Sequence, residues 1–214
     1  MRKEKYDASQ YDIRQLVQAY LQCDNLPKLH EKNAFAGRLD EDNDQSTGLH
    51  RLFYDGMDSS SAFKDLYDRF VKEVVRPQFD FDIIFQTFPT FRIHQPNNIA
   101  VFEYHRDRDY NHNPKEINIF LPMTKAYDSN TFWIESVEGL EDYTPAEATY
   151  GEFLIFDGAN LRHGNKENVT PDTRVSFDFR VMNIADYDEE HQLSLTSKTK
   201  GKRFIIGEYF QSMD

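Results

Sequence analysis

Two histidines, one carboxylate and one arginine have the types and spacing of a reactive metal site. His105 and Asp107 stand two residues apart at the end of the apolar run 99–102, and His163 and Arg174 follow further along the chain. Two imidazoles and one carboxylate form the facial ligand set of iron(II) sites, which leaves coordination positions open. An arginine fork is the usual partner of a carboxylate on a co-substrate. The four residues therefore predict an iron(II) site with a clamp for an organic acid.

The spacing of His105 and Asp107 fits a β-strand. Residues i and i+2 of a strand face the same side, so one metal ion would receive both side chains. We expect His163 to complete the set from a separate strand of the same sheet. His-x-Asp by itself is a weak signal, because a chain with seven histidines contains such a pair by chance. Asp109 is a rival carboxylate, which we place on a solvated loop beyond the strand.

A strict alternation of polar and apolar residues marks the stretch 174–180. Arg174, Ser176, Asp178 and Arg180 share one face of the expected strand. An exposed strand face produces the same pattern. If this face instead lines the inside of a barrel, the guanidinium of Arg174 needs a buried anion to offset its desolvation. Arg174 and Ser176 would then bind one carboxylate together.

Helices are expected first along the chain. Apolar residues recur at helical spacing over 8–22, with Ser9 or Asp12 as the cap, and over 61–76, with caps in 59–61 and an end at Pro77. The polar stretch 24–50 predicts a loop, and this loop is a candidate part of a lid.

From residue 81 the pattern changes to short runs rich in aromatic and β-branched residues, separated by turn signals. Short strands behind a helical section predict a mainly β fold, and a jelly roll fits their number. The polar stretch 186–202 is expected to be an exposed loop. We expect one domain over 1–214, with a helical section at 1–80 and a jelly-roll core at 81–214. The eight expected strands are 82–88, 90–94, 99–105, 116–121, 131–135, 152–156, 173–182 and 203–209.

Composition narrows the classes of partner and location. The chain has 25 Lys and Arg against 37 Asp and Glu, a formal net charge of −12. This charge argues against nonspecific binding to nucleic acid or to an anionic membrane. No run approaches the roughly 18 apolar residues of a membrane span, and no secretory signal is recognisable. The single cysteine, Cys23, permits no intrachain disulfide, so a cytoplasmic location is the simplest expectation.

Taken together, these motifs resemble the iron(II)- and 2-oxoglutarate-dependent dioxygenase superfamily, whose pattern is His-x-Asp, a distal His, and an Arg or Lys about ten residues later. The Arg-x-Ser pair at Arg174 and Ser176 is similar to that of several subfamilies. Within the superfamily the chain looks most like the phytanoyl-CoA-hydroxylase-like branch and, more narrowly, the group that includes a streptomycin-biosynthesis oxygenase. The resemblance covers about residues 90–183, through the segments 105–110, 116–124, 130–136, 151–158, 163–165 and 174–180.

This resemblance implies a double-stranded β-helix, in agreement with the jelly roll, and a role for each motif residue. His105, Asp107 and His163 would ligate Fe(II), while Arg174, assisted by Ser176, would pair with the distal carboxylate of 2-oxoglutarate. With O2, the implied reaction decarboxylates 2-oxoglutarate and hydroxylates, desaturates or cyclises a small biosynthetic metabolite. The carboxylate at Asp107 argues against a halide-transferring variant. CoA-ester specificity is not carried over, because no basic patch for a CoA phosphate is evident.

Four further residues are candidates for the walls of the site. Asn118 interrupts an apolar run, so it would face the cavity and touch cofactor or substrate, although an outward-facing residue fits the alternation equally well. Trp133 would either line the substrate pocket or fill the core. Arg92 and His94 share one strand face and are candidates for contacts with substrate or with the proximal end of the co-substrate.

Two other functional classes stay open. The same barrel occurs in metal-dependent cupins that act as isomerases, or as dioxygenases without 2-oxoglutarate, and there Arg174 would have no co-substrate to hold. A non-catalytic barrel used for binding would hold no stoichiometric iron. In the enzyme classes the expected partner is a small molecule, and neither its identity nor the oligomeric state follows from the sequence.

Overall fold

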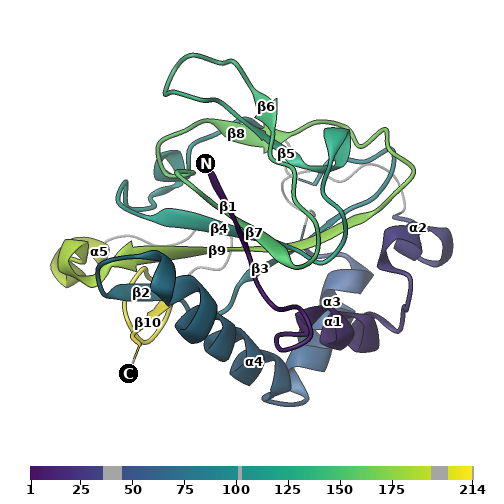
Figure 1. Cartoon of the computed structure of the whole chain (residues 1–214), viewed down its shortest axis with the longest axis horizontal. Helices are drawn as coiled ribbons and strands as arrows, with labels where there is room; N and C mark the ends of the chain where they lie inside the picture. The colour runs from purple at the N-terminus through teal and green to yellow at the C-terminus, as the bar shows by residue number, and fades with distance from the viewer. Residues whose placement is uncertain (36–44, 101–102, 194–201, 214) are drawn as a thin grey trace.

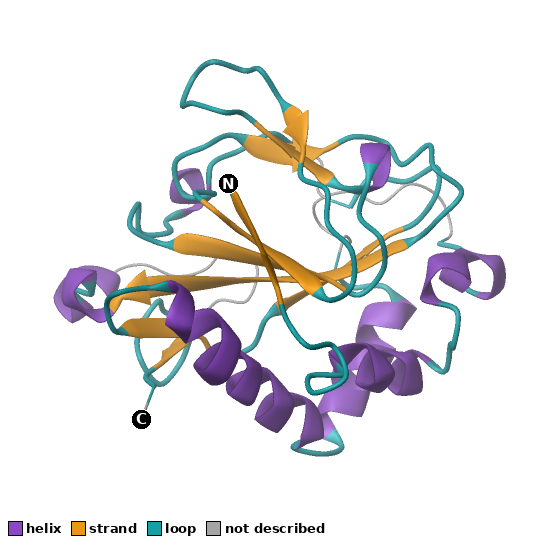
Figure 2. Cartoon of the chain, in the orientation of Figure 1, coloured by secondary structure: helices purple, strands orange, loops and turns teal. Residues whose placement is uncertain are grey.

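The computed structural model describes residues 1–35, 45–100, 103–193 and 202–213. Three layers are visible in Figures 1 and 2: helices α1, α3 and α4 lie along one face of a large sheet, and a small sheet lies on its other side. Every strand pair within these sheets is antiparallel. The arrangement is the predicted mainly β fold with N-terminal helices, a double-stranded β-helix.

The helices agree with the periodicity expected over 8–22 and 61–76, and further helical elements lie in the stretches 24–50 and 186–202, which were expected to be loops. Asp12 caps α1, because its side chain accepts a hydrogen bond from the backbone N–H of Gln15. The loop expected at 24–50 is wrong in part, since η1, α2 and the start of α3 fall within it; residues 36–44 lie outside the described residues. None of the helices described is long and apolar enough to cross a membrane. The helical elements are α1 (Ile13–Leu21), η1 (Leu26–Lys28), α2 (Leu29–Lys32), α3 (Gly48–Asp58), α4 (Ala62–Phe70), η2 (Val71–Val75), η3 (Arg76–Gln78), η4 (Asp107–Tyr110), η5 (Asp128–Asn130), η6 (Ile184–Asp186) and α5 (Glu189–Leu193).

The large sheet has the order β1-β7-β4-β9-β2-β10, with β3 also paired to β9, and the small sheet has the order β6-β5-β8. The long strand β9 is therefore central, with β4, β2 and β3 all hydrogen-bonded to it. The strands are β1 (Arg2–Lys5), β2 (Ile83–Gln86), β3 (Thr90–His94), β4 (Ile117–Pro122), β5 (Phe132–Ile134), β6 (Thr144–Pro145), β7 (Glu152–Phe156), β8 (His163–Asn165), β9 (Arg174–Asn183) and β10 (Phe210–Gln211).

Three strand expectations need correction. Strand β1 lies in the section expected to be helical and pairs with β7. The strand expected at 99–105 is reduced to a single bridge between His105 and His163; residues 101 and 102 lie outside the described residues. The strand expected at 203–209 appears instead as β10, because Gly207, at φ 93°, turns the chain before it.

The side chains of β9 point alternately to the two faces of the large sheet, and a different apolar cluster lies on each face. Val175, Phe177 and Phe179 pack in the core beneath the helices, where the rings of Phe53 and Phe91 stack at 4.1 Å. A second cluster joins the two sheets, and the polar residues of β9 point toward it. Arg174 is 3% exposed and Ser176 is fully buried, so the polar face of β9 is an interior one.

Candidate metal centre

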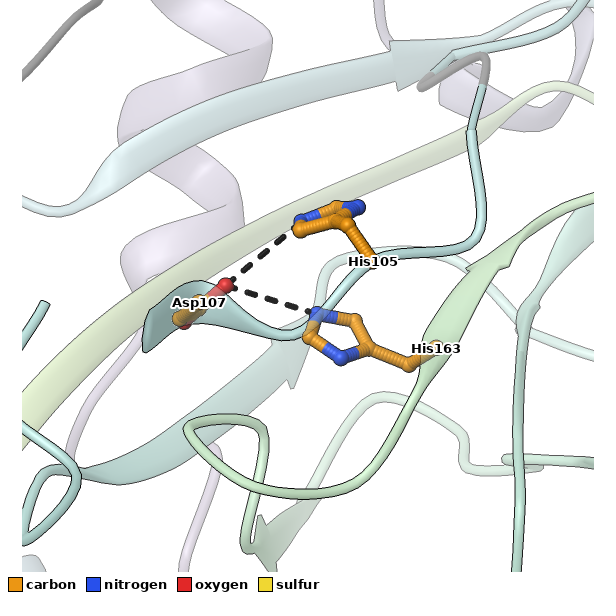
Figure 3. A group of neighbouring side chains, drawn as sticks. All are labelled: His105, Asp107 and His163. Atoms are coloured by element: carbon orange, nitrogen blue, oxygen red, sulfur yellow. Dashed lines mark ion pairs between the residues drawn. The ribbon is translucent and has the colours of Figure 1, made fainter. Parts of the chain in front are cut away.

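His105, Asp107 and His163 meet between the two sheets (Figure 3). Oδ1 of Asp107 lies 3.5 Å from Nε2 of His105 and 3.6 Å from Nε2 of His163. The donor atoms of the three residues all lie within 4.8 Å of one another. Metal–nitrogen and metal–oxygen bonds are about 2 Å long, so donors at these separations can hold a single ion. The His-x-Asp…His arrangement inferred from the sequence is therefore present in space.

A β-bridge sets the two histidines side by side. The backbone N–H of His105 donates to the carbonyl of His163 at 3.0 Å, and that of His163 donates to the carbonyl of His105 at 2.9 Å. Gly164 permits the approach, because a Cβ at that position would lie 3.0 Å from Cα of Tyr104. His163 lies on β8 of the small sheet, where it faces the segment that carries His105.

Asp107 reaches the imidazoles from a turn rather than from a strand, which corrects the expected geometry. The chain leaves the bridge after His105, and Asp107 begins the short helix η4, with its backbone N–H donating to the carbonyl of Gly158 at 2.9 Å. Asp109 braces this turn by accepting hydrogen bonds from the backbone and the guanidinium of Arg106. Its side chain is 40% exposed, as expected for a solvated carboxylate.

Both histidines are held in the tautomer that suits a metal ligand. Nδ1 of His105 lies 2.9 Å from the carbonyl of Glu103, and Nδ1 of His163 lies 3.0 Å from the carbonyl of Leu161. A carbonyl oxygen only accepts, so each Nδ1 carries the hydrogen and each Nε2 keeps its lone pair. Burial also lowers the pKa of His163, which favours the neutral, ligating form.

Asp107 is held by a group that we call the carboxylate clamp, formed by Asn118 and Arg180. Nδ2 of Asn118 donates to Oδ2 of Asp107 at 2.7 Å, and Nε and Nη2 of Arg180 donate to the same oxygen at 3.0 and 2.9 Å. Burial alone would raise the pKa of Asp107, but the charge of Arg180 and the nearby histidines together outweigh it and hold that pKa well below its usual value. Oδ1 is thereby directed at the two histidines. The role of Arg180 was missed from the sequence, although Arg180 shares a face with Arg174.

The donor set opens on a cavity between the sheets. Arg174 lies in its wall, with Nη2 3.4 Å from Oδ1 of Asn165 and Cζ 5.7 Å from the centre of the Phe120 ring. Oγ of Ser176 is buried and has no hydrogen-bond partner among the residues described. The lining is Arg92, His105, Asn118, Phe120, Phe132, Phe156, His163, Gly164, Asn165, Arg174, Asp178 and Arg180. Asn165 and the three phenylalanines were not predicted, because nothing local separates them from core or strand residues.

A chain of ion pairs links the cavity wall to Asp107. Nε of Arg92 donates to Oδ1 of Asp178 at 2.9 Å, and Nη1 of Arg180 donates to Oδ2 of Asp178 at 3.1 Å. Arg180 also pairs with Asp107. Arg92, predicted as a substrate-binding residue, is therefore in the wall and connected to Asp107 through two intervening side chains.

The two other predicted wall residues lie outside the cavity lining. The ring nitrogens of His94 lie 2.8 and 3.1 Å from the backbone carbonyls of Asn98 and Asn130. Along β5 the alternation turns Phe132 into the cavity and Trp133 away from it, where Nζ of Lys166 lies 3.2 Å above the indole. Neither His94 nor Trp133 is therefore placed to line the site.

Comparisons with known proteins give a relative that is similar over almost its whole length. No family model matches the chain. Solved structures with a related chain path include the non-haem monooxygenase ThoJ in complex with nickel (TM-score 0.49, 13% identity, 84% of this chain and 71% of that chain) and EctD from S. alaskensis with bound Fe (TM-score 0.49, 13% identity, 87% and 73%). Both TM-scores are below 0.5 and both identities are low, so the nickel and the iron are properties of those two proteins and are not carried over to this chain.

The streptomycin biosynthesis protein StrG of Streptomyces griseus is 37% identical over 210 residues, which are 98% of this chain and 96% of StrG. This similarity confirms the resemblance to the streptomycin-biosynthesis group that the motifs indicated. The chain belongs to the family of StrG.

Proposed function

We propose that the protein is a non-haem iron(II) oxygenase that couples oxidative decarboxylation of 2-oxoglutarate to hydroxylation, desaturation or cyclisation of a small biosynthetic molecule. The observation that carries this proposal is the convergence of Nε2 of His105, Oδ1 of Asp107 and Nε2 of His163 beside a cavity. Two imidazoles and one carboxylate are the facial ligand set of non-haem iron(II) oxygenases. The similarity to StrG supports a biosynthetic role.

The donor set fits iron(II) by its chemistry. Both histidines present a lone pair at Nε2, because each Nδ1–H donates to a carbonyl. Asp107 presents Oδ1 alone, because the carboxylate clamp occupies Oδ2. When bound, iron(II) with 2-oxoglutarate and dioxygen would supply the oxidising chemistry, and the protein would supply orientation.

The far carboxylate of 2-oxoglutarate would be held by two residues of β9, Arg174 in the cavity lining and Ser176 outside that lining. Arg174 offers a buried guanidinium fork, and Asn165 orients one of its nitrogens. The hydroxyl of Ser176 is buried among the described residues without a hydrogen-bond partner, which costs free energy unless a ligand satisfies it. Arg174 and Ser176 would therefore hold this carboxylate together, as the Arg-x-Ser pattern predicts.

Asn118 would complete the cofactor-facing wall. Its Nδ2 is used by Asp107, while its buried Oδ1 has no hydrogen-bond partner among the residues described. That oxygen would accept a hydrogen bond from cofactor or substrate. Arg92 and Asp178 lie in the cavity lining and pair with each other, and they would contact the substrate.

The aromatic lining would keep water from the reacting centre. Phe132 and Phe156 lie against His163, with ring centres 6.2 and 5.6 Å from the imidazole, and Phe120 lies beside Arg174. An apolar wall strengthens the electrostatic contacts of Arg174 and limits side reactions with water.

The decisive experiment measures succinate formed from 2-oxoglutarate by protein loaded anaerobically with iron(II), first alone and then with a panel of small metabolites. We expect slow turnover without a metabolite and faster turnover with the correct one. His105→Ala and Asp107→Ala should each abolish iron binding and turnover. Asp65→Ala, which changes an exposed carboxylate on α4, is the matched control and should retain both. Iron retained by both ligand variants, or none bound by the wild type, would refute the proposal.

A further inference from the structure

Gly158 lies directly against the side chain of Asn118. A Cβ built on Gly158 would be 2.7 Å from Cγ of Asn118 and 2.8 Å from its Nδ2 and Oδ1, closer than real Cβ contacts come. The carbonyl of Gly158 also accepts the backbone N–H of Asp107 at 2.9 Å. Gly158 therefore touches both the metal ligand and one half of the carboxylate clamp.

Backbone conformation does not account for this glycine. The glycines with positive φ among the described residues are Gly139, Gly151 and Gly207, and Gly158 is not one of them. An alanine at 158 could adopt the same backbone without strain. The missing Cβ, rather than conformational freedom, is what position 158 contributes to the site.

Asn118 has little freedom to move away from an added methyl group. It lies on β4 between β7 and β9, opposite Phe156 and Arg180, and is 1% exposed. Its Nδ2 lies 2.7 Å from Oδ2 of Asp107, so a shift away from position 158 lengthens or breaks this bond. Without it, Arg180 alone would hold Oδ2, and the carboxylate could rotate about its Cβ–Cγ bond.

We propose that Gly158 is a positioning residue of the metal centre: it leaves the space in which Asn118, together with Arg180, holds Oδ2 so that Asp107 ligates through Oδ1 alone. This inference rests on the proposed metal site, but not on 2-oxoglutarate or on the reaction. Partners that orient a metal ligand typically change metal affinity about 10- to 100-fold when removed. We expect a loss of metal affinity in the same range when a Cβ at position 158 fills the space for Asn118.

The test is a titration with Co(II), whose visible absorption bands report the ligand geometry and which binds without turnover. Gly158→Ala and Asn118→Ala should each weaken Co(II) binding by about 10-fold or more and alter the bands. The double variant should bind no more weakly than Asn118→Ala, because Gly158 acts only through Asn118. Gly48→Ala is the matched control: Gly48 has no positive φ and nothing within 4 Å of an added Cβ, so binding should not change.

Three results would overturn the inference. The first is wild-type affinity and spectrum in Gly158→Ala. The second is additive losses in the double variant, because these would mean that Gly158 acts independently of Asn118. If Gly158→Ala alone does not fold, the double variant should fold, since removing the amide makes room for the Cβ; its failure is the third. A wild type that binds no Co(II) would instead refute the metal site itself.

Discussion

Replacement of Arg180 by methionine should destabilise the metal-free protein strongly, because Arg180 is the charge partner of the buried carboxylate of Asp107. The side chain of Arg180 is 10% exposed and donates three hydrogen bonds, two to Asp107 and one to Asp178. Asp178 keeps Arg92 at 2.9 Å in the variant. Asp107, 2% exposed, loses its guanidinium partner and keeps the amide of Asn118 and the two imidazoles near Oδ1. Removal of one partner of a buried ion pair costs about 3–5 kcal/mol. At about 2–4 °C per kcal/mol, the melting temperature should fall by about 6–20 °C.

The stability lost in Arg180→Met should depend on pH in a defined direction. In the wild type the pKa of Asp107 is held well below its usual value, so ionisation of Asp107 stabilises the fold above about pH 4, and that stabilisation is lost as pH falls through the lowered pKa. Without Arg180 we expect burial, the largest influence on Asp107, to raise its pKa above the usual value, so that ionisation above about pH 4 favours unfolding. The difference in free energy of unfolding between wild type and Arg180→Met should therefore grow as pH rises from 4 to 7.

The assay is urea unfolding followed by circular dichroism at pH 4, 5.5 and 7, with EDTA present to remove metal. Arg180→Met combined with Asp107→Asn should recover part of the loss at pH 7, because the unpaired charge is gone. Arg203→Met, which changes an exposed arginine paired with Glu208, is the control and should have little effect. A loss that is independent of pH, or no recovery in the double variant, would show that Arg180 acts by packing and would refute the reasoning.

Two further substitutions test the proposed 2-oxoglutarate contact and the alignment of the two histidines separately. Arg174→Ala should raise KM for 2-oxoglutarate about 10- to 100-fold, the value of about one charge-assisted hydrogen bond, while Co(II) affinity stays within a few-fold. An unchanged KM in steady-state succinate assays would exclude Arg174 as the residue that holds 2-oxoglutarate and would favour a cupin that does not use 2-oxoglutarate. Gly164→Ala should push apart the bridge that aligns His105 and His163, since its Cβ would meet backbone at 3.0 Å, and should weaken Co(II) binding about 10-fold; wild-type affinity would show that the bridge is not needed.

Much of the fold followed from local patterns. Helical spacing located α1 and α4, and runs of β-branched and aromatic residues located β2, β3, β4, β5, β7 and β9. Local patterns failed for α3 and β1, where mostly polar segments gain their stability by packing onto other elements. Leu49 and Phe53 of α3 are buried in the main core, for example, although the preceding stretch is polar.

The sequence by itself determined the residue types of the site and the faces they share. A period of two places Arg174, Ser176, Asp178 and Arg180 together on β9 whatever surrounds the strand. His-x-Asp with a distal histidine has the donor types of the proposed iron(II) site. These conclusions need only the chain itself, because alternation is a local property of the backbone.

Only the tertiary structure decided which of these side chains meet. In the folded chain the polar face of β9 is buried, and Arg180 donates hydrogen bonds to Asp107. A single β-bridge joins His163 to His105, and Gly158 lies against Asn118. Each of these contacts joins residues far apart in the chain, and its distance is set by the register of β4 and β9 and by the packing of the two sheets. A periodicity shows which residues share a face, but the partner across that face depends on the packing of the whole molecule.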